Sequence, residues 1–356
     1  MKISLIKVVI RKGMAGYLLR EKFVDLMLPI TGFFWGFSLL PPRIIGIEPT
    51  NRCNLNCLMC PRAYWDKEDN RLGDMPLDLF EAKILPYLKK SQTIILQCLG
   101  EPLIADNFFE MLKRTKEKGC RVQFNTNGLL LKETAKRLVE LDVDGVTISI
   151  DGIKTLKDIR GVDIEKLIEG IHEVNNAKLD LSSKNPVLGI EFVAMEKNVR
   201  ELPLVIDLAG KLGIKSVNVV HAVIHANKLL EQSLFKHIDL AKKYFDEAYI
   251  RARSAGISLK LPPLDKIVKF CRQPFEMIFI NWNGDVRPCC ISTINEENSI
   301  TVGNLNDSTL EKIWNNSAMR KLRVSLLRNK GLTRFCLNCA LRVNTLESHK
   351  RILKHG

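Results

Sequence analysis

The amino-acid sequence predicts an α/β fold built on a parallel sheet. From Ile44 to about Pro262, short apolar runs alternate with longer segments whose apolar residues recur at helical spacing. Strands that are each followed by a helix pair in parallel, because the helix returns the chain to the same edge of the sheet. This spacing fits an open doubly wound sheet and a barrel equally well, so periodicity does not decide between them.

The predicted elements follow in order along the chain. The expected strands lie at Ile44–Ile47, Thr93–Gln97, Arg121–Asn125, Val146–Ile150, Val187–Ala194 and Ser216–Val220. The expected helices lie at Leu77–Lys90, Asn107–Lys118, Lys132–Leu141, Ile164–Ala177, Leu202–Leu212 and about Glu231–Ala255. Gly119 and Gly213 stand where helices should stop. A length of 356 residues predicts an N-terminal extension (1–43), a large domain (44–262) and a smaller domain (263–356) after Pro262-Pro263.

Three cysteines follow the first expected strand on one short loop. Cys53, Cys57 and Cys60 are separated by three and then two residues. Three thiolates fill three corners of a [4Fe–4S] cube and leave one iron open to an exogenous ligand. A structural zinc site would need a fourth Cys or His at short range, and none occurs between Cys60 and Cys98. Disulfides are not expected, because the chain lacks a cleavable secretory signal and its ten cysteines lie at metal-ligand spacings.

This loop resembles the CxxxCxxC signature of the radical S-adenosylmethionine superfamily. The resemblance implies a partial (β/α)6 TIM-like barrel over residues 44–262, with function at the C-terminal ends of its strands. It also implies S-adenosylmethionine on the open iron. In that family the cofactor is cleaved to a 5′-deoxyadenosyl radical that abstracts hydrogen from a substrate. The residue before the third cysteine is commonly aromatic in the family and is Met59 here, whose thioether can fill the same space.

The end of the second strand resembles the superfamily's GGE-type motif. In Leu99-Gly100-Glu101-Pro102 the resemblance implies that Gly100 and Glu101 hold the methionine amino group, for which a carboxylate is a suitable partner. The alternative is a tight turn with an exposed glutamate. After the third strand, Asn127 lies in a TNG segment that would line the cofactor cavity, although Asn and Gly also make turns.

The end of the fourth strand resembles the S(L/I)DG…R pattern of the same superfamily. By that resemblance Ser149 and Arg160 hold the methionine carboxylate, which the planar guanidinium fits. Asp151 is expected either to contact the ribose or to cap a helix. Met195, after the fifth strand, would contact adenine or belong to the core.

The last third of the chain carries a second group of cysteines, at Cys271, Cys289, Cys290, Cys336 and Cys339. Their order resembles the short form of the SPASM or twitch domain, a small α+β iron–sulfur domain. The resemblance implies one auxiliary [4Fe–4S] cluster on Cys271, Cys289, Cys336 and Cys339, with Cys290 as a spare. Zinc on the same four thiolates remains open, because spacing does not exclude it. A cluster with four protein ligands would accept or relay an electron rather than bind substrate.

A formal net charge of +14 permits nucleic acid, anionic lipid or an acidic protein as partner. Nucleic acid is not expected, because the basic residues lack interleaved aromatics. The family chemistry implies reduction by an acidic ferredoxin or flavodoxin. Residues 26–40 are apolar but too short and too interrupted to span a bilayer. They are expected to pack over the barrel, and the alternative is contact with a membrane surface or a lipidic substrate. Cluster assembly needs a reducing compartment, so a cytoplasmic location is expected.

The resemblance implies an enzyme that abstracts hydrogen from a small molecule, such as a sugar, cyclitol or lipid precursor, while the auxiliary cluster accepts or relays an electron. The second hypothesis is a maturase for a peptide, protein or metal cofactor. A non-enzymatic electron carrier or zinc-stapled binding module is the alternative from another class. His221 and His225 follow the last expected strand as a conceivable general base or as structural residues. No catalytic acid or base is identified from the sequence.

Overall fold

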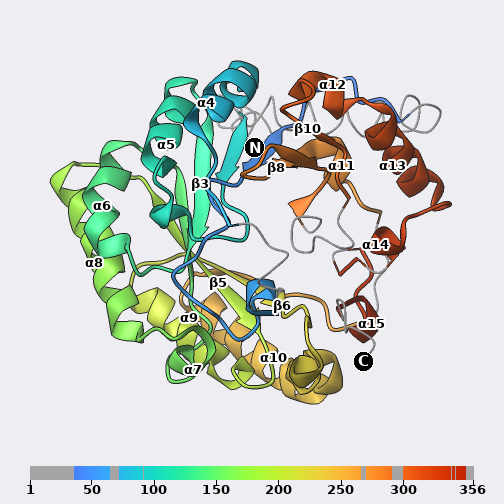
Figure 1. Ribbon diagram of the computed structural model, residues 1–356. Coiled ribbons are helices and arrows are strands. Elements are labelled where there is room, and N and C mark those ends of the chain that lie inside the picture. The colour runs from blue at the N-terminus through green and yellow to red at the C-terminus, as the bar shows by residue number, and fades with distance from the viewer. Residues whose placement is uncertain are drawn as a thin grey trace, which may run out of the picture.

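The computed structural model describes residues 36–64, 72–90, 92–265, 270–290, 300–337, 339–340 and 342–349. Within these ranges the strands form one sheet in the order β10-β9-β8-β1-β2-β3-β4-β5-β6-β7. The strands are β1 (Ile44–Ile47), β2 (Thr93–Leu96), β3 (Arg121–Thr126), β4 (Gly145–Ser149), β5 (Val187–Ala194), β6 (Ser216–His221), β7 (Ser258–Lys260), β8 (Met277–Ile280), β9 (Asp285–Arg287) and β10 (Gly303–Asn304). Figure 1 shows the sheet curving, with the helices on its outer side.

The helices that cover the curved sheet are α5 (Phe108–Glu117), α6 (Leu131–Glu140), α8 (Ile164–Asp180), α9 (Leu202–Lys211) and α10 (Ile238–Ser254). Shorter helices are α4 (Leu77–Leu79), α7 (Leu156–Arg160), α11 (Gln273–Glu276), α12 (Leu310–Trp314), α14 (Arg334–Leu337) and α15 (Leu346–His349), and α13 (Ser317–Arg328) is the longest beyond β8. In Figure 1 the helices α11 to α13 lie beside β8 and β10, and α14 and α15 continue from there toward β6 and α10.

The predicted parallel sheet is confirmed, and it forms a partial barrel. Neighbouring strands from β1 to β7 all pair in parallel. Strand β8 returns to the other side of β1, also in parallel, with Ile44 opposite Met277. Strands β9 and β10 extend this edge in antiparallel pairing. The C-terminal part of the chain therefore shares the sheet of the core, and a division into domains at residue 263 stays a prediction.

Two predicted helices differ from the structure, and the first difference has a local reason. The segment expected as Leu77–Lys90 starts as α4 but continues as a π-turn and a 3₁₀ turn that ends at Tyr87. Pro86 lies in that 3₁₀ turn and has no N–H to donate to an α-helix. The last expected helix begins at Ile238 instead of Glu231, after short 3₁₀ turns. Gly119 and Gly213 have positive φ angles of 71° and 72° and end their helices as predicted.

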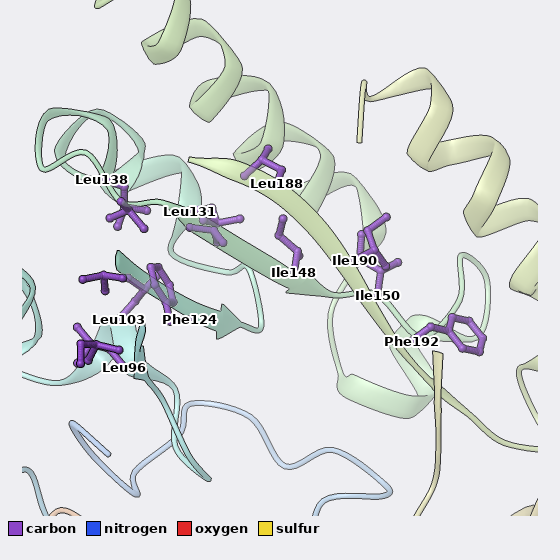
Figure 2. Close-up of a cluster of buried hydrophobic side chains, with 14 of the residues drawn as sticks. Leu96, Leu103, Phe124, Leu131, Leu138, Ile148, Ile150, Leu188, Ile190 and Phe192 are labelled. Carbon is purple, nitrogen blue, oxygen red and sulfur yellow. The ribbon is translucent and has the colours of Figure 1, made fainter. Parts of the chain in front are cut away.

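The main core lies between the sheet and the outer helices. Figure 2 shows side chains of successive strands in this layer, among them Phe124, Ile148 and Ile190. All three are at most 1% exposed. Alternate residues of these strands point the other way, so one side of the sheet is apolar and packed against helices. The opposite side faces the lumen of the barrel.

The described part of the N-terminal extension packs against the C-terminal helices. The Ser38 N–H donates to Asn315 Oδ1 over 2.9 Å, and the Trp314 ring N–H donates to the Leu40 carbonyl over 2.8 Å. Residues 26–35 of the predicted apolar segment lie outside the described residues. Among the residues that the structure describes, no helix is both long enough and apolar enough to cross a membrane.

Candidate active site

The cysteine loop starts where β1 ends and is held by its neighbours through backbone hydrogen bonds. The Asn51 N–H donates to the Gly73 carbonyl over 3.2 Å, and the Glu101 N–H donates to the Arg52 carbonyl over 2.8 Å. Further along the loop, the Leu58 N–H donates to the carbonyl of Ile159 over 2.8 Å. The loop is thereby fixed to the end of β2 and to α7.

The three loop thiols lie close enough to influence one another electrostatically. Cys57 is buried, and Cys53 and Cys60 are half-buried. Burial raises the pKa of the Cys57 thiol to about 11, while the nearby Arg160 opposes that rise. Because thiolates are the form that binds metal, a positively charged iron site would offset the cost of ionising these groups. The donor set therefore fits three corners of an iron–sulfur cluster.

Met59 fills the position that is commonly aromatic in the family. Its side chain is 7% exposed and belongs to a small apolar cluster with Cys57, Ile159, Met195 and Ala222. Met195 is fully buried in this cluster, which supports its assignment to the core. This apolar cluster thus packs against the cysteine loop without an aromatic ring.

Gly100 leaves room for the cysteine loop to approach the end of β2. A Cβ atom at this position would lie 2.2 Å from the Thr50 carbonyl oxygen and 2.5 Å from that of Arg52. Both contacts are with backbone, which cannot swing away as a side chain can. The absence of a side chain at Gly100 is therefore a requirement of the loop geometry.

A Gly100→Ala substitution is expected to displace the cysteine loop and to lower the iron content of the reconstituted protein from about eight toward about four per chain. Iron and sulfide analysis measures this directly. Gly210→Ala, on α9, is the matched control, because the nearest atom to its added Cβ lies at 3.8 Å. Full iron content in Gly100→Ala would show that the close approach is not needed.

Glu101 is buried rather than exposed, which contradicts the simple turn alternative. Its Oε1 accepts hydrogen bonds from Thr126 Oγ1 (2.8 Å) and the Leu103 N–H (3.2 Å), and its Oε2 accepts from the Asn127 N–H (2.7 Å). Burial raises the pKa of this carboxyl, and the hydrogen bonds oppose the shift. The carboxylate thus ties the end of β2 to the end of β3.

Asn127 links the end of β3 to the cysteine loop. Its Nδ2 donates to Asn54 Oδ1 over 2.8 Å and lies 4.0 Å from Cys53 Sγ. Its Oδ1 accepts from the Leu129 N–H over 3.0 Å, which is also a turn contact. The residue therefore shapes a turn and lies beside the cysteine loop, while its place in the cofactor cavity stays a prediction.

Arg160 and Asp151 form a buried ion pair beside the cysteine loop. Arg160 Nε lies 2.5 Å from Asp151 Oδ2, and Arg160 Nη1 lies 3.8 Å from Cys57 Sγ. The Asp151 side chain is fully buried, and its Oδ1 accepts from the Val193 N–H over 2.6 Å. Burial raises the pKa of Asp151, and Arg160 opposes that rise. The pair fixes a guanidinium next to the cysteines.

The alternative that Asp151 caps a helix is wrong. The backbone N–H groups before α7 donate instead to Glu201 Oε2, from Ile153 over 2.6 Å and from Lys154 over 2.9 Å. Glu201 lies about 50 residues further along the chain, so no local pattern could have identified it. Ser149 is half-buried, and its hydroxyl makes no hydrogen bond with another described residue. The ribose contact of Asp151 and the role of Ser149 stay predictions.

The C-terminal cysteines also come together. Burial raises the pKa of Cys271 to about 12, and Cys289, Cys336 and Cys339 are close enough to add to the shift. Cys290 is the fifth thiol of this group, and burial raises its pKa as well. Among the described residues, no group of three or more His, Cys, Asp or Glu side chains has the spacing that a single metal ion needs. The iron–sulfur expectation rests on the chemistry of this donor set.

His221 is buried, and its side chain makes contacts within the fold. Its Nε2 lies 2.9 Å from the carbonyl oxygen of Pro263, and its ring packs against Phe235 with 4.6 Å between centroids. Burial lowers the pKa of the imidazole. These contacts favour the structural alternative. His225 is half-buried, and its role as a base stays a prediction.

Two family models match the chain. The model of the radical SAM superfamily matches residues 47–201, and that of an iron–sulfur cluster-binding domain, SPASM, matches residues 271–340. The chain belongs to the radical SAM superfamily and carries a C-terminal SPASM domain. This radical SAM protein is therefore an enzyme that uses a [4Fe–4S] cluster and S-adenosylmethionine, with further iron–sulfur chemistry in the SPASM domain. The electron-carrier and zinc-module alternatives are set aside.

Known radical SAM enzymes resemble this one over most of its length. The tungsten-containing aldehyde ferredoxin oxidoreductase cofactor-modifying protein of Pyrococcus furiosus is 28% identical over 324 residues, which are 84% of this chain and 88% of that protein. The AdoMet-dependent heme synthase of Methanosarcina barkeri is 25% identical over 311 residues, covering 79% and 85%. The crystal structure of Streptococcus suis SuiB bound to its precursor peptide SuiA has a TM-score of 0.63 at 17% identity, covering 97% and 83%.

Proposed function

We propose that this radical SAM enzyme abstracts a hydrogen atom from a polar small molecule or cofactor precursor held in the barrel lumen. In this proposal Cys53, Cys57 and Cys60 hold the catalytic cluster. The auxiliary cluster is held by Cys271, Cys289, Cys336 and Cys339 and accepts or relays an electron. When bound, the catalytic cluster and S-adenosylmethionine supply a 5′-deoxyadenosyl radical. The protein binds and orients the cofactor and the substrate, and it excludes water from the site.

The cofactor contacts are proposed from the groups that surround the cysteine loop. Arg160 is fixed 3.8 Å from Cys57 Sγ by its pair with Asp151, which supports it as the partner of the methionine carboxylate. Ser149 has a hydroxyl available on the lumen side for the same group. Gly100 and Glu101 are proposed to face the methionine amino group, because the hydrogen bond from the Glu101 N–H to the Arg52 carbonyl holds both residues beside the cysteine loop.

The observation that carries the proposed substrate class is a belt of polar side chains in the lumen. We call this the polar belt, and its members are Gln97, Asn125, Ser149, Glu191 and Asn218. These residues alternate with the buried apolar positions of β3 to β6 and the end of β2, and each is half-buried. Ser149, Glu191 and Asn218 are direct register partners across three strands. A lumen lined in this way suits a ligand with several hydrogen-bonding groups.

Glu191 is the charged member of the polar belt. Its Oε2 accepts from Asn218 Nδ2 over 3.2 Å, and the Asn125 side chain also hydrogen-bonds to it. Burial raises the pKa of this carboxyl. Two amide donors leave a carboxylate with acceptor sites to spare. Substrate hydroxyl, amino or amide N–H groups would fill them, whereas an alkyl chain would leave them unpaired, which disfavours a lipid precursor.

The sequence relatives support a cofactor precursor within this class. The Pyrococcus furiosus relative, which this chain matches over 88% of its length, is named for cofactor modification. The Methanosarcina barkeri relative is named as a heme synthase. At 17% identity SuiB, whose structure holds a precursor peptide, supports the fold alone. A metal-cofactor or organic-cofactor precursor therefore takes priority over a peptide.

The proposed electron donor is an acidic ferredoxin or flavodoxin, in a cytoplasmic setting. The net charge of +14 would speed its docking. Reduction rates that stay constant between low and high ionic strength would contradict electrostatic docking. Contact between residues 26–40 and a membrane surface stays a prediction.

The substrate class can be tested with deuterated cell extract. Cells grown in deuterated medium supply a small-molecule fraction and a polypeptide fraction, each incubated with reduced enzyme and unlabelled S-adenosylmethionine. Abstraction from a labelled substrate gives 5′-deoxyadenosine that is one mass unit heavier. Deuterium from the small-molecule fraction supports the proposal, and deuterium from the polypeptide fraction alone contradicts it.

A Glu191→Gln substitution is expected to lower deuterium transfer from the small-molecule fraction at least tenfold. The physical reason is that hydrogen bonds to a charged acceptor contribute about 1.5–3 kcal/mol. Glu173→Gln, on the exposed face of α8, is the control and should transfer deuterium normally. Unchanged transfer by Glu191→Gln would remove the polar belt from the substrate site.

A further inference from the structure

Glu48 is a buried carboxylate that the reaction described so far does not use. It follows β1 directly and is 2% exposed. Because β1 lies between β2 and β8, the end of β1 borders both the core and the C-terminal part of the chain. Glu48 Oε1 accepts from the Leu99 N–H over 3.3 Å, and Glu48 Oε2 accepts from the Trp282 N–H over 3.2 Å. The Glu48 side chain thus joins the segment that follows β2 to the segment that follows β8.

Each of these segments leads to one cofactor site. Leu99 directly precedes Gly100 and Glu101, which pack against the cysteine loop. Trp282 lies in the turn between β8 and β9, and β9 leads to Cys289. The two hydrogen bonds of Glu48 therefore connect the catalytic loop to the SPASM domain through a single carboxylate.

The Trp282 ring strengthens this connection. A Cβ atom on Gly73 would come within 2.3 Å of the ring, so the indole packs directly on that glycine. The Gly73 carbonyl in turn accepts the Asn51 N–H, two residues before Cys53. The turn of the SPASM domain thus packs on Gly73, the residue that hydrogen-bonds the start of the cysteine loop.

We propose that Glu48 is a positioning residue that sets the catalytic loop and the SPASM domain in register with each other. The proposal rests on the proposed placement of S-adenosylmethionine at Gly100 and Glu101. It goes beyond that placement by assigning the coupling of the two cofactor sites to one side chain. A carboxylate suits this role because it can accept an N–H on each oxygen.

Glu48→Gln tests the role with almost no change in shape. The amide has one acceptor oxygen, so its NH₂ group must face one of the two backbone N–H groups and lose that bond. Glu48→Asp keeps the charge on a shorter stem. Glu276→Gln is the matched control, because Glu276 pairs with Arg43 at the opposite end of the same β1–β8 pair.

The first readout is independent of turnover. In reconstituted protein, amide hydrogen exchange should be at least tenfold faster in Glu48→Gln than in wild type at whichever of Leu99 and Trp282 faces the NH₂ group. It should be unchanged at both in Glu276→Gln. The second readout is 5′-deoxyadenosine formed per catalytic cluster, which should fall about tenfold in Glu48→Gln and recover in part in Glu48→Asp. Iron content should stay at about eight per chain.

The pH dependence of exchange separates this role from simple packing. Burial raises the pKa of Glu48 to about 7, with Leu99 N–H, Trp282 N–H, the Cys98 thiol and Arg287 opposing the rise. Protection of both amides, corrected for intrinsic exchange, should increase from pH 6 to pH 8 in wild type as the carboxyl ionises. The increase should be absent in Glu48→Gln.

Three results would overturn the proposal. They are unchanged exchange at both amides in Glu48→Gln, equal losses in Glu276→Gln, and a loss of iron in Glu48→Gln that Glu48→Asp does not reverse. Failure of the proposed function is distinguishable, because deuterium would then reach 5′-deoxyadenosine from the polypeptide fraction alone while the exchange difference remained.

Discussion

A chain in which Cys53, Cys57 and Cys60 are all replaced by alanine is expected to bind about four irons instead of about eight and to form no 5′-deoxyadenosine. The three thiols lie on one loop and are proposed to be the protein's complete ligand set for the catalytic cluster, so their removal abolishes that site. The SPASM cysteines are untouched and keep their cluster. Iron and sulfide analysis, combined with mass spectrometry of the nucleoside, measures both effects.

Cys120→Ala is the control for this variant. Cys120 is 3% exposed and its thiol lies 3.4 Å from the Lys89 carbonyl, away from both cysteine groups. It should bind about eight irons and cleave S-adenosylmethionine as wild type does. A triple variant that still held about eight irons, or still formed the nucleoside, would contradict the ligand assignment.

Arg160→Gln is expected to give the second large effect, a loss of S-adenosylmethionine binding of at least a hundredfold. The substitution removes the guanidinium proposed for the methionine carboxylate. It also leaves the fully buried Asp151 without its cation, which costs about 3–5 kcal/mol of folding stability when one partner of a buried pair is lost. Equilibrium binding and chemical denaturation under anaerobic conditions measure the two effects separately.

The double variant Asp151→Asn/Arg160→Gln separates stability from binding. Removing both charges should restore most of the lost stability, because no buried charge is left unpaired. Binding of S-adenosylmethionine should remain weak, because the guanidinium is still absent. Recovery of binding along with stability would show that Arg160 acts only through the fold.

Local patterns predicted the parts of the fold that local physics determines. The strands β1 to β6 and the glycine ends of two helices follow from alternation and from backbone freedom, and they are confirmed. Pro86 interrupts the helix expected over Leu77–Lys90. The proline is visible in the sequence, but the apolar spacing around it is helical and led to the prediction of one continuous helix. The pairing of β8 with β1 joins residues more than 200 positions apart, so no local signal encodes it.

In the candidate site, too, the local sequence predicted some features, while others depend on tertiary packing. Cysteine spacing indicated iron–sulfur chemistry, which the family match confirms. The partners of individual side chains were not predictable, because the Glu201 bonds to the turn before α7 and the Glu48 bonds to Leu99 and Trp282 depend on tertiary packing. The polar belt was hidden because alternation in a strand does not tell which side faces a lumen.

Anaerobic reconstitution of the wild-type chain, followed by dithionite, S-adenosylmethionine and an assay for 5′-deoxyadenosine, tests most directly whether the protein is a radical SAM enzyme with two clusters. We predict about eight irons per chain and formation of 5′-deoxyadenosine with methionine. Zinc without iron, or a fully loaded protein that leaves S-adenosylmethionine intact, would contradict it.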